Sequence, residues 1–271
     1  MSKVVCDISV SADGYGAGPN QTREKPFGDG PVERLHAWMF DTPDENKAEL
    51  NEIVSAGAFV MGRNMFGPIR GEWDLNWTGW WGDEPPYHSP VFVLTHNPRQ
   101  PLTMQGGTTF TFVTDGIESA LAQARATAGD RNVAIAGGAA TINQYLRADH
   151  IDELRTHIVP VTLGAGARLF EDVPALNLEI ISTRGASLVT HITYRVLADI
   201  EGVLRPATPA RVSSVPVRAD DHDSRIAHAV PSSGSMPCWR SRARRRSISV
   251  RRWRNCPARD GRSGCAAVHS S

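Results

Sequence analysis

The strongest local pattern in the chain is the sequence Val133-Ala134-Ile135-Ala136-Gly137-Gly138-Ala139-Ala140-Thr141. It predicts a buried strand that passes through a diglycine directly into a helix. Glycine allows a sharp turn and lets a ligand approach without a Cβ in the way, and the first free amides of a helix favour an anion. Two interpretations stay open with equal weight: a cradle for a pyrophosphate, or a tight strand–helix turn that needs glycine.

Two other predicted strands end on side chains that suit a phosphate ligand. Gly62 and Arg63 follow one short apolar run, and a guanidinium pairs with a phosphate in a planar, two-pronged way. Thr95 follows the next apolar run and offers a hydroxyl group. Plainer alternatives are a surface ion pair for Arg63 and a turn at Asn97. Because open α/β sheets bind ligands beyond the carboxyl ends of their strands, the three strand ends together favour a ligand site.

The body of the chain alternates short apolar runs with helical patterns, which predicts a layered α/β domain with a mostly parallel sheet. The last three strands have no helical pattern between them, so we expect an antiparallel closing edge. The expected strands are residues 4–10, 58–61, 91–94, 109–113, 132–136, 154–161, 176–182 and 188–196. The expected helices begin at Pro43 with Thr42 as N-cap, after Asp115, and at Ala139.

A second glycine pattern, Gly164-Ala165-Gly166, starts like a dinucleotide-binding fingerprint. Leu169 occupies the position of its third glycine, and the pattern lies late in the chain between strands. We interpret it as a turn.

The charges divide the chain into two parts. Residues 1–198 hold 15 Lys and Arg against 23 Asp and Glu, whereas residues 199–271 hold 14 Arg, no Lys and 6 acidic residues. The tail is rich in Arg, Ser and Pro and lacks apolar periodicity, which predicts a disordered segment after a single domain. Its arginines could contact nucleic acid, but a solvated, accidental extension is the favoured interpretation.

Cysteine and hydropathy patterns predict a cytoplasmic protein. Cys6 is the single cysteine of residues 1–198, which favours a reducing compartment. Asp7 and Asp13 interrupt the apolar stretch after Lys3, unlike a signal peptide. No apolar run approaches the roughly 20 residues of a membrane-spanning helix, so no membrane partner is expected.

Six stretches in family order resemble the dihydrofolate reductase superfamily, and most closely the C-terminal reductase domain of the bifunctional riboflavin-biosynthesis deaminase–reductase. They cover residues 3–198 and are Ser9-Val10-Ser11-Ala12-Asp13-Gly14-Tyr15, Val60-Met61-Gly62-Arg63, Val93-Leu94-Thr95, Ala136-Gly137-Gly138-Ala139, Ile151-Asp152-Glu153-Leu154 and residues 159–166, Val-Pro-Val-Thr-Leu-Gly-Ala-Gly. The resemblance implies a three-layer fold, NADPH as hydride donor and a homodimer.

The resemblance also implies roles for individual residues. Gly62, Arg63 and Thr95 would bind the adenosine 2′-phosphate side of the cofactor. Asp13 and Gly14 would lie beside the nicotinamide. The pyrophosphate would be held by Gly137, Gly138, Ala139, Ala140 and Thr141.

Two departures from the family pattern affect the expected substrate. The zinc signature of the deaminase half, H-x-E…P-C-x-x-C, is missing, so no metal is expected. The Asp-Asp-Pro run after the Gly-Arg pair is replaced by a tryptophan-rich stretch, residues 72–90. Trp80 and Trp81 in that stretch either cover a flat heteroaromatic substrate or pack over the sheet edge, with near-equal weight.

A proton donor is harder to identify. Asp44 lies near the place where folate reductases carry a carboxylic acid, and it is a weak catalytic candidate. A role in the first turn of a helix is the favoured alternative for Asp44. His88 is a second candidate because histidine is a common general acid, but a lone loop histidine is usually just exposed.

Together these observations favour an NADPH-dependent oxidoreductase. Its expected substrate is a small heterocycle, pteridine-like or pyrimidine-like, as in 5-amino-6-(5-phosphoribosylamino)uracil reductase or dihydrofolate reductase. A broad-specificity reductase with the same cofactor site is a second possibility. The alternative from another class is a non-catalytic NADPH-binding module whose basic tail contacts a partner or nucleic acid.

Overall fold

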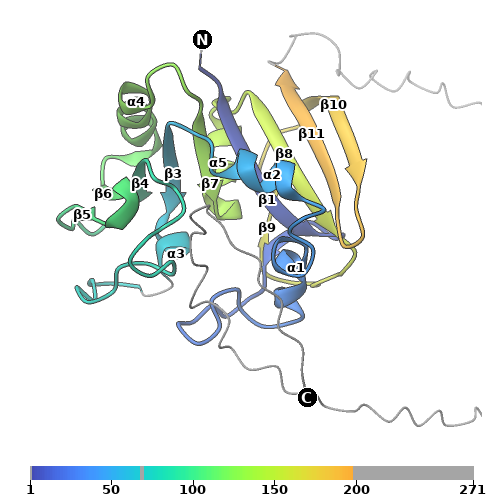
Figure 1. Cartoon of the computed structure of the whole chain (residues 1–271), viewed down its shortest axis with the longest axis horizontal. Coiled ribbons are helices and arrows are strands. Elements are labelled where there is room, and N and C mark those ends of the chain that lie inside the picture. The colour runs from blue at the N-terminus through green and yellow to red at the C-terminus, as the bar shows by residue number, and fades with distance from the viewer. Residues whose placement is uncertain (1, 68–69, 198–271) are drawn as a thin grey trace, which may run out of the picture. The chain divides into compact units, whose positions relative to one another are not determined.

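A computed structural model describes residues 2–67 and 70–197 (Figure 1). The chain divides into two units, Met1–Asp199 and Ile200–Ser271. The expected tail falls in the second unit, outside the described residues, so the predictions made for it stay predictions.

The first unit is built on a nine-stranded sheet with the strand order β10-β11-β8-β1-β7-β3-β4-β6-β5. In chain order these strands are β1 (Val4–Ser11), β3 (Ala58–Gly62), β4 (Pro90–Leu94), β5 (Leu102–Thr103), β6 (Thr109–Val113), β7 (Val133–Gly137), β8 (Glu153–Val159), β10 (Asn177–Gly185) and β11 (Thr190–Leu197). A separate pair joins β2 (Tyr15–Ala17) to β9 (Ala167–Arg168). The eight expected strands are all present.

The centre of the sheet is parallel and its ends are antiparallel. Strands β8, β1, β7, β3, β4 and β6 run parallel, and their apolar runs are buried because both faces are covered. Strand β11 pairs antiparallel with β8, and β10 pairs antiparallel with β11. The expected closing edge is therefore confirmed, and β5 adds a short antiparallel strand at the other end.

Helices cover both faces, which makes three layers. On one face, α4 (Gly116–Ala128) and α5 (Ala139–Arg147) bury Leu121, Ala124 and Ile142 against alternate residues of the central strands. On the other face, α2 (Lys47–Ile53) lies across β1 and β8 (Figure 1). The short α1 (Ala37–Phe40) and the 3-10 helix η1 (Val32–His36) pack nearby, and α3 (Arg63–Phe66) follows β3 directly.

One helix boundary differs from the expected one. The helix expected from Pro43 begins at Lys47, with Asn46 at the N-cap position, and residues 43–46 form a turn. The Asn46 side chain donates to the carbonyl oxygens of Trp38 (3.2 Å) and Thr42 (2.8 Å), which binds that turn to the end of α1. Sequence pattern alone did not reveal η1, α1 or α3.

Across residues 2–67 and 70–197, no helix is both long enough and apolar enough to cross a membrane.

Candidate functional site

The diglycine turn and the Gly-Arg pair lie on neighbouring strands. β3 pairs parallel with β7, and Met61 is opposite Gly137, so Gly62 and Gly138 follow at the same edge of the sheet. A Cβ on Gly62 would lie 2.3 Å from the Thr141 hydroxyl oxygen, which explains why glycine stands where α5 crosses the strand end. The expectation that these two strand ends lie at one edge of the sheet is therefore confirmed.

The first turn of α5 leaves space beside Gly138. Gly137 has φ +112°, a conformation that favours glycine. Apart from the residues next to Gly138 in the chain, no atom of the described residues lies within 4 Å of the place where its Cβ would be. The amides of Thr141 and Ile142 bond back to the Gly138 carbonyl, at 2.9 and 3.1 Å. Helix geometry leaves the amides of Ala139 and Ala140 without an intrahelical acceptor, so they are available to an anion.

Arg63 is held beside this turn with part of its hydrogen-bonding capacity unused. Its guanidinium carbon lies 3.9 Å from the centre of the Trp73 ring, a cation–π contact. One terminal nitrogen donates to the Glu72 carbonyl at 3.4 Å, but the buried Nε has no partner among the described residues. Burial lowers the pKa of Arg63, and the charge of Arg70 lowers it further. A bound anion would offset both the burial of the Arg63 guanidinium and the repulsion from Arg70.

A second arginine, Arg99, lies against the same indole, although no pattern in the sequence indicated it. Its guanidinium carbon lies 5.3 Å from the same Trp73 ring, and its buried Nη1 also lacks a partner among the described residues. Its Nη2 donates to the Leu75 carbonyl at 3.1 Å. Burial lowers the pKa of Arg99, and the charge of Asp74 opposes that shift. Two guanidinium groups therefore lie against the same indole.

Thr95 and Asn97 build the support for these arginines. The Thr95 hydroxyl accepts from the Asn97 amide at 3.1 Å, which closes the turn after β4. The Asn97 carbonyl accepts from the Trp73 indole N–H at 2.8 Å, and the Asn97 side chain donates to the Gly71 carbonyl at 2.9 Å. Thr95 thus contributes to the turn that fixes Trp73, which corresponds to the plainer interpretation of this segment.

Asp13 and Gly14 form a clamp between two loops. The Asp13 carboxylate accepts from the Ser11 hydroxyl at 2.5 Å and from the amides of Gly164 and Leu163 at 2.7 and 3.1 Å. These hydrogen bonds, that of Ser11 foremost, lower the pKa of Asp13 to about 2. Gly14 has φ +87° and makes the turn into β2. The interpretation of residues 164–166 as a turn agrees with their position in the structure, where they form the other side of this clamp.

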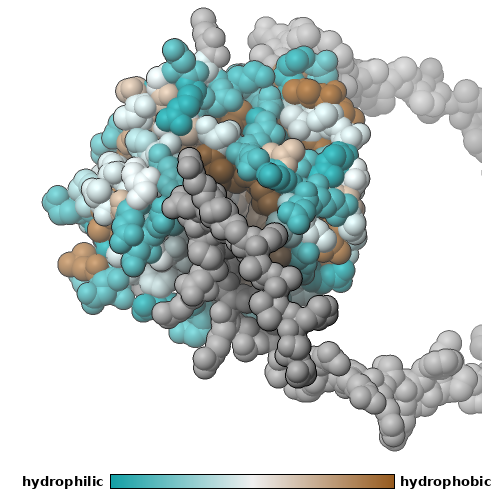
Figure 2. Space-filling model, viewed as in Figure 1, coloured by the Kyte–Doolittle hydropathy of each residue, from teal (hydrophilic) through white to brown (hydrophobic). Residues whose placement is uncertain are grey.

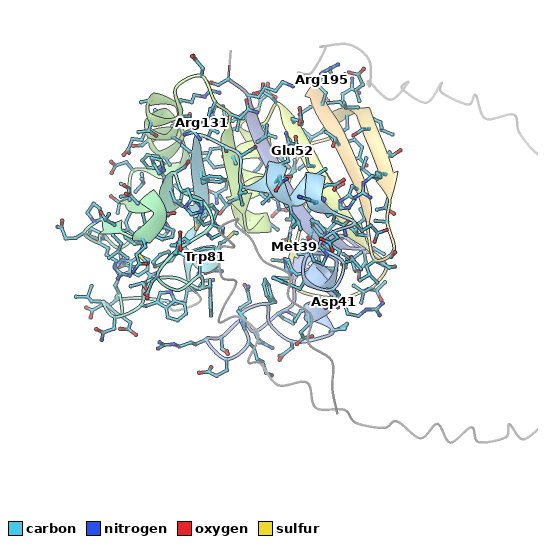
Figure 3. All side chains as sticks on the ribbon, in the orientation of Figure 1. Met39, Asp41, Glu52, Trp81, Arg131 and Arg195 are labelled. Atoms are coloured by element: carbon cyan, nitrogen blue, oxygen red, sulfur yellow. The ribbon has the colours of Figure 1, made fainter. Side chains whose placement is uncertain are left out.

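The tryptophan-rich stretch packs its own indoles over the sheet. Trp81 stacks on Phe110 with ring centres 5.8 Å apart, and it meets Tyr87 edge-on at 5.2 Å. Trp80 is half-buried and meets Trp77 edge-on at 4.6 Å. In Figure 3, Trp81 lies near α3, at the end of β3. Of the two interpretations, the self-packing one matches the position of Trp81.

The two candidate proton donors, Asp44 and His88, are both exposed. Asp44 is exposed in the turn before α2, so its expected place in a first helical turn is wrong. The neighbouring Glu45 accepts from the amide of Ser187 at 3.0 Å. His88 is also exposed, and its Nδ1 lies 2.8 Å from the Gly106 carbonyl oxygen.

The sequence profile of the RibD C-terminal domain family matches residues 2–191. The chain belongs to this family. The family assignment confirms the resemblance seen in the sequence, and the matched residues include the whole of the site described above.

Individual curated proteins and solved structures are also similar to this chain. The uncharacterized protein YyaP of Bacillus subtilis is 26% identical over 205 residues, which are 71% of this chain and 94% of YyaP. The uncharacterized protein YwjB of the same organism is 36% identical over 63 residues, 23% of this chain and 36% of YwjB. A putative riboflavin biosynthesis protein from Shewanella sp. PV-4 has a crystal structure with a TM-score of 0.51 and 25% identity, covering 72% of this chain and 99% of that one.

Proposed function

We propose that the chain is a reductase that takes its hydride from NADPH and acts on a small heterocyclic substrate, pteridine-like or pyrimidine-like. One observation carries the proposal: an arginine with an unpartnered buried nitrogen follows β3, and a helix with free first-turn amides follows the adjacent β7. Two anion-binding groups at one sheet edge match a ligand that carries separate phosphate groups.

The residues present fit such a cofactor. The open space at Gly138 leaves room for a pyrophosphate against the amides of Ala139 and Ala140. Arg63 and Arg99 would hold a 2′-phosphate, because their guanidinium groups retain donors that no described residue accepts. NADPH, when bound, supplies the hydride.

The protein's own contribution is alignment and exclusion of water. Trp73 holds both guanidinium groups in place, and the packed indoles of Trp77 and Trp81 close the sheet face beside α3. Asp13 fixes the loop after β1, which the family resemblance places beside the nicotinamide. A small-molecule substrate, a cytoplasmic location and a homodimer stay predictions, as does the alternative of a non-catalytic NADPH-binding module.

Calorimetry with NADPH and NADH tests the cofactor site. Replacing Arg63 by Gln removes charge-assisted hydrogen bonds to a phosphate, so the Kd for NADPH should rise about tenfold or more. The Kd for NADH, which lacks the 2′-phosphate, should change little. Arg99→Gln should act in the same direction. Arg125→Gln, at an exposed position on α4, is the matched control.

The test has clear contrary outcomes. Absence of heat with NADPH in well-folded protein would refute the cofactor site, and equal losses for NADPH and NADH would refute the role of Arg63. Oxidation of NADPH in the presence of pteridines, but not pyrimidines, or the reverse, would then assign the substrate class. Binding without oxidation of NADPH by any member of the panel would favour the non-catalytic alternative.

A further inference from the structure

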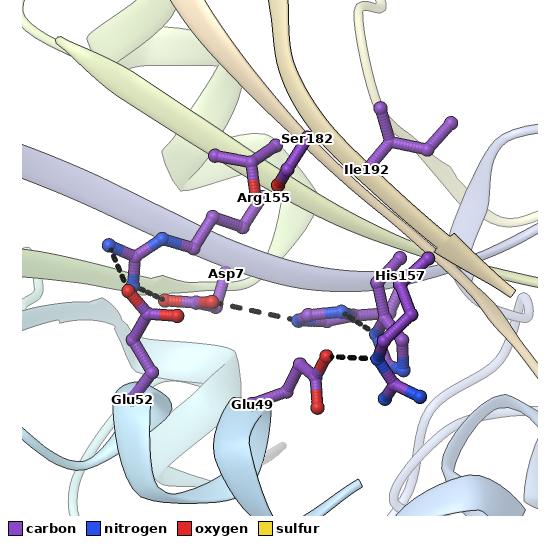
Figure 4. A pocket seen from close by; sticks show the side chains of 10 residues that line it. Asp7, Glu49, Glu52, Arg155, His157, Ser182 and Ile192 are labelled. Carbon is purple, nitrogen blue, oxygen red and sulfur yellow. Dashed lines mark hydrogen bonds and ion pairs between the residues drawn. The ribbon is translucent and has the colours of Figure 1, made fainter. Parts of the chain in front are cut away.

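A second polar site lies on the sheet face under α2, away from the diglycine turn. A cavity of about 100 Å³ opens there between α2 and strands β1, β8, β10 and β11 (Figure 4). Its charged and imidazole-bearing walls are Asp7, Glu49, Glu52, Arg155, His157, Arg184 and His191. Asp7, Arg155, His157 and His191 are largely buried, whereas the Glu52 and Arg184 side chains are 51% and 40% exposed. Buried side chains of this kind are rarely left without a specific partner.

Most of the charges in this cavity are paired. Arg155 contacts Glu153 at 2.6 Å, Glu52 at 2.9 Å and Asp7 at 3.5 Å. Arg184 contacts Glu49 at 2.7 Å. Glu153 also pairs with Lys3 at 3.0 Å, so four carboxylates face three cations, an excess of one negative charge.

The hydrogen bonds and the lowered pKa of His191 together indicate where the two histidines carry their protons. Asn46 Oδ1 accepts from Arg184 Nη2 at 2.9 Å, and arginine can only donate, so this atom is an acceptor. His191 Nε2, 2.9 Å from the same oxygen, must therefore donate. Burial, and then the nearby His157, lower the pKa of His191 to about 4, so it is neutral at pH 7 and its Nδ1 is an acceptor.

The proton positions leave His157 with an unused acceptor. His157 Nδ1 lies 2.8 Å from His191 Nδ1 and must donate to it. In neutral His157 the Nε2 then carries a lone pair, 3.6 Å from Asp7 Oδ1, which is also an acceptor. This nitrogen has no hydrogen-bond partner among the described residues, although His157 is only 3% exposed.

Glu49 adds another unused acceptor. Its Oε1 accepts from Arg184, but its buried Oε2 has no partner among the described residues. Figure 4 shows the Glu49 and His157 side chains lining the same cavity, with a dashed line that joins His157 to Asp7. Acceptors buried without donors cost free energy, so a group rich in N–H donors would be stabilised between them.

The side chains are not arranged as metal ligands. Within residues 2–67 and 70–197, no three His, Cys, Asp or Glu side chains converge as a metal ion requires. A cation that donates hydrogen bonds accepts longer distances to its partners than a metal ion accepts to its ligands. The cavity volume leaves room for more than one water-sized group.

We propose that this cavity binds a small nitrogen cation, ammonium or a primary alkylammonium, whose N–H groups donate to His157 Nε2 and Glu49 Oε2. The excess of carboxylates over cationic side chains supplies the attraction for a positive charge. The site is separate from the proposed cofactor site. The rival explanation is a second proton on His157, directed at Asp7.

Nitrogen NMR of the full-length protein with ¹⁵N-labelled histidine distinguishes the two. We expect His157 Nε2 to be unprotonated in cation-free buffer, and its resonance to shift with a saturable dependence on methylammonium chloride. Tetramethylammonium chloride at the same ionic strength carries the same charge without N–H donors, so it should leave the resonance in place. Ammonium chloride should act like methylammonium.

Variants locate the binding group. Glu49→Gln should weaken the methylammonium response about tenfold or more, because it removes the charge from one acceptor. Glu171→Gln, at an exposed carboxylate outside the cavity, should leave the response unchanged. If Glu49→Gln does not fold, the comparison of methylammonium with tetramethylammonium still decides. A doubly protonated His157 in cation-free buffer, or the same response to both cations, overturns the proposal.

Discussion

Asp13 shows how one side chain can join two distant parts of the chain. Its carboxylate binds the turn after β1 to the amides of Leu163 and Gly164, 150 and 151 residues away. Hydrogen bonds from backbone amides to an ionised carboxylate are stronger than those to a neutral acceptor, so the charged form of Asp13 stabilises this loop pair. Loss of the negative charge should loosen the loop beside the proposed cofactor site.

The stability contributed by Asp13 should depend on pH. Its pKa in the folded chain is about 2, below the value of 3.8 for a free side chain. The contribution is therefore complete above about pH 4 and is lost as the pH falls toward 2. In urea unfolding, the difference between the wild type and Asp13→Asn should be constant near neutral pH and shrink below about pH 4. The exposed Asp130→Asn should show no such trend; a difference independent of pH would contradict the assignment.

The predictability of the site differs from residue to residue. Gly62, Arg63 and the diglycine turn were found because strand ends and glycines are visible in a sequence, and parallel strands bring their ends together. Arg99 was missed because it follows Pro98 in a loop, and nothing local shows that it shares Trp73 with Arg63. The role of Thr95 was only partly visible, because its hydroxyl serves the turn that orients Trp73.

At the scale of elements, α2 shows why helix starts are hard to predict. Pro43 and Thr42 carry the signals of a first turn, but the Asn46 side chain is bound to the carbonyl oxygens of the preceding segment. That competition delays the helix to Lys47. The four-residue helices α1 and α3 are too short to produce a periodic pattern, which explains why sequence analysis missed them.

Two tryptophans of the tryptophan-rich stretch differ in how many aromatic rings they contact. Trp81 packs against Phe110 and Tyr87, so Trp81→Ala should lower the free energy of unfolding by about 2–4 kcal/mol. Trp80 contacts Trp77 alone among the described aromatic rings, so Trp80→Ala should cost about 1 kcal/mol or less. Urea unfolding of both variants measures this. Equal losses would contradict the packing argument, and a raised KM for Trp80→Ala alone would assign the substrate contact to that residue.

At the scale of the whole molecule, one end of the sheet is a long edge strand. β10 spans nine residues, and within residues 2–67 and 70–197 it pairs with β11 alone. Ile180 and Ile181 on this strand are 62% and 45% exposed. Two copies of an antiparallel edge strand can pair about a two-fold axis, and proteins rarely leave such edges uncovered.

We therefore expect the predicted homodimer to form through β10. Ile180→Lys should shift the mass measured by light scattering from dimer to monomer, because it places a charge in the contact. Leu75→Lys, which alters an exposed apolar side chain elsewhere, should leave the mass unchanged. A wild-type chain that is monomeric at micromolar concentration would contradict this assembly.

The order of strands in the chain differs from their order in the sheet, and this has a consequence during synthesis. Of the described strands, β1 comes first in the chain, yet its neighbours in the sheet are β7 and β8. Val4 pairs with Val133 and Val5 with Glu153, and both partners are synthesised much later. At roughly 5–20 residues per second, translation takes on the order of ten seconds to reach those partners. During that interval the apolar side chains of β1 stay exposed on the ribosome. The nascent chain should therefore depend on chaperones, and depleting them should lower its soluble yield.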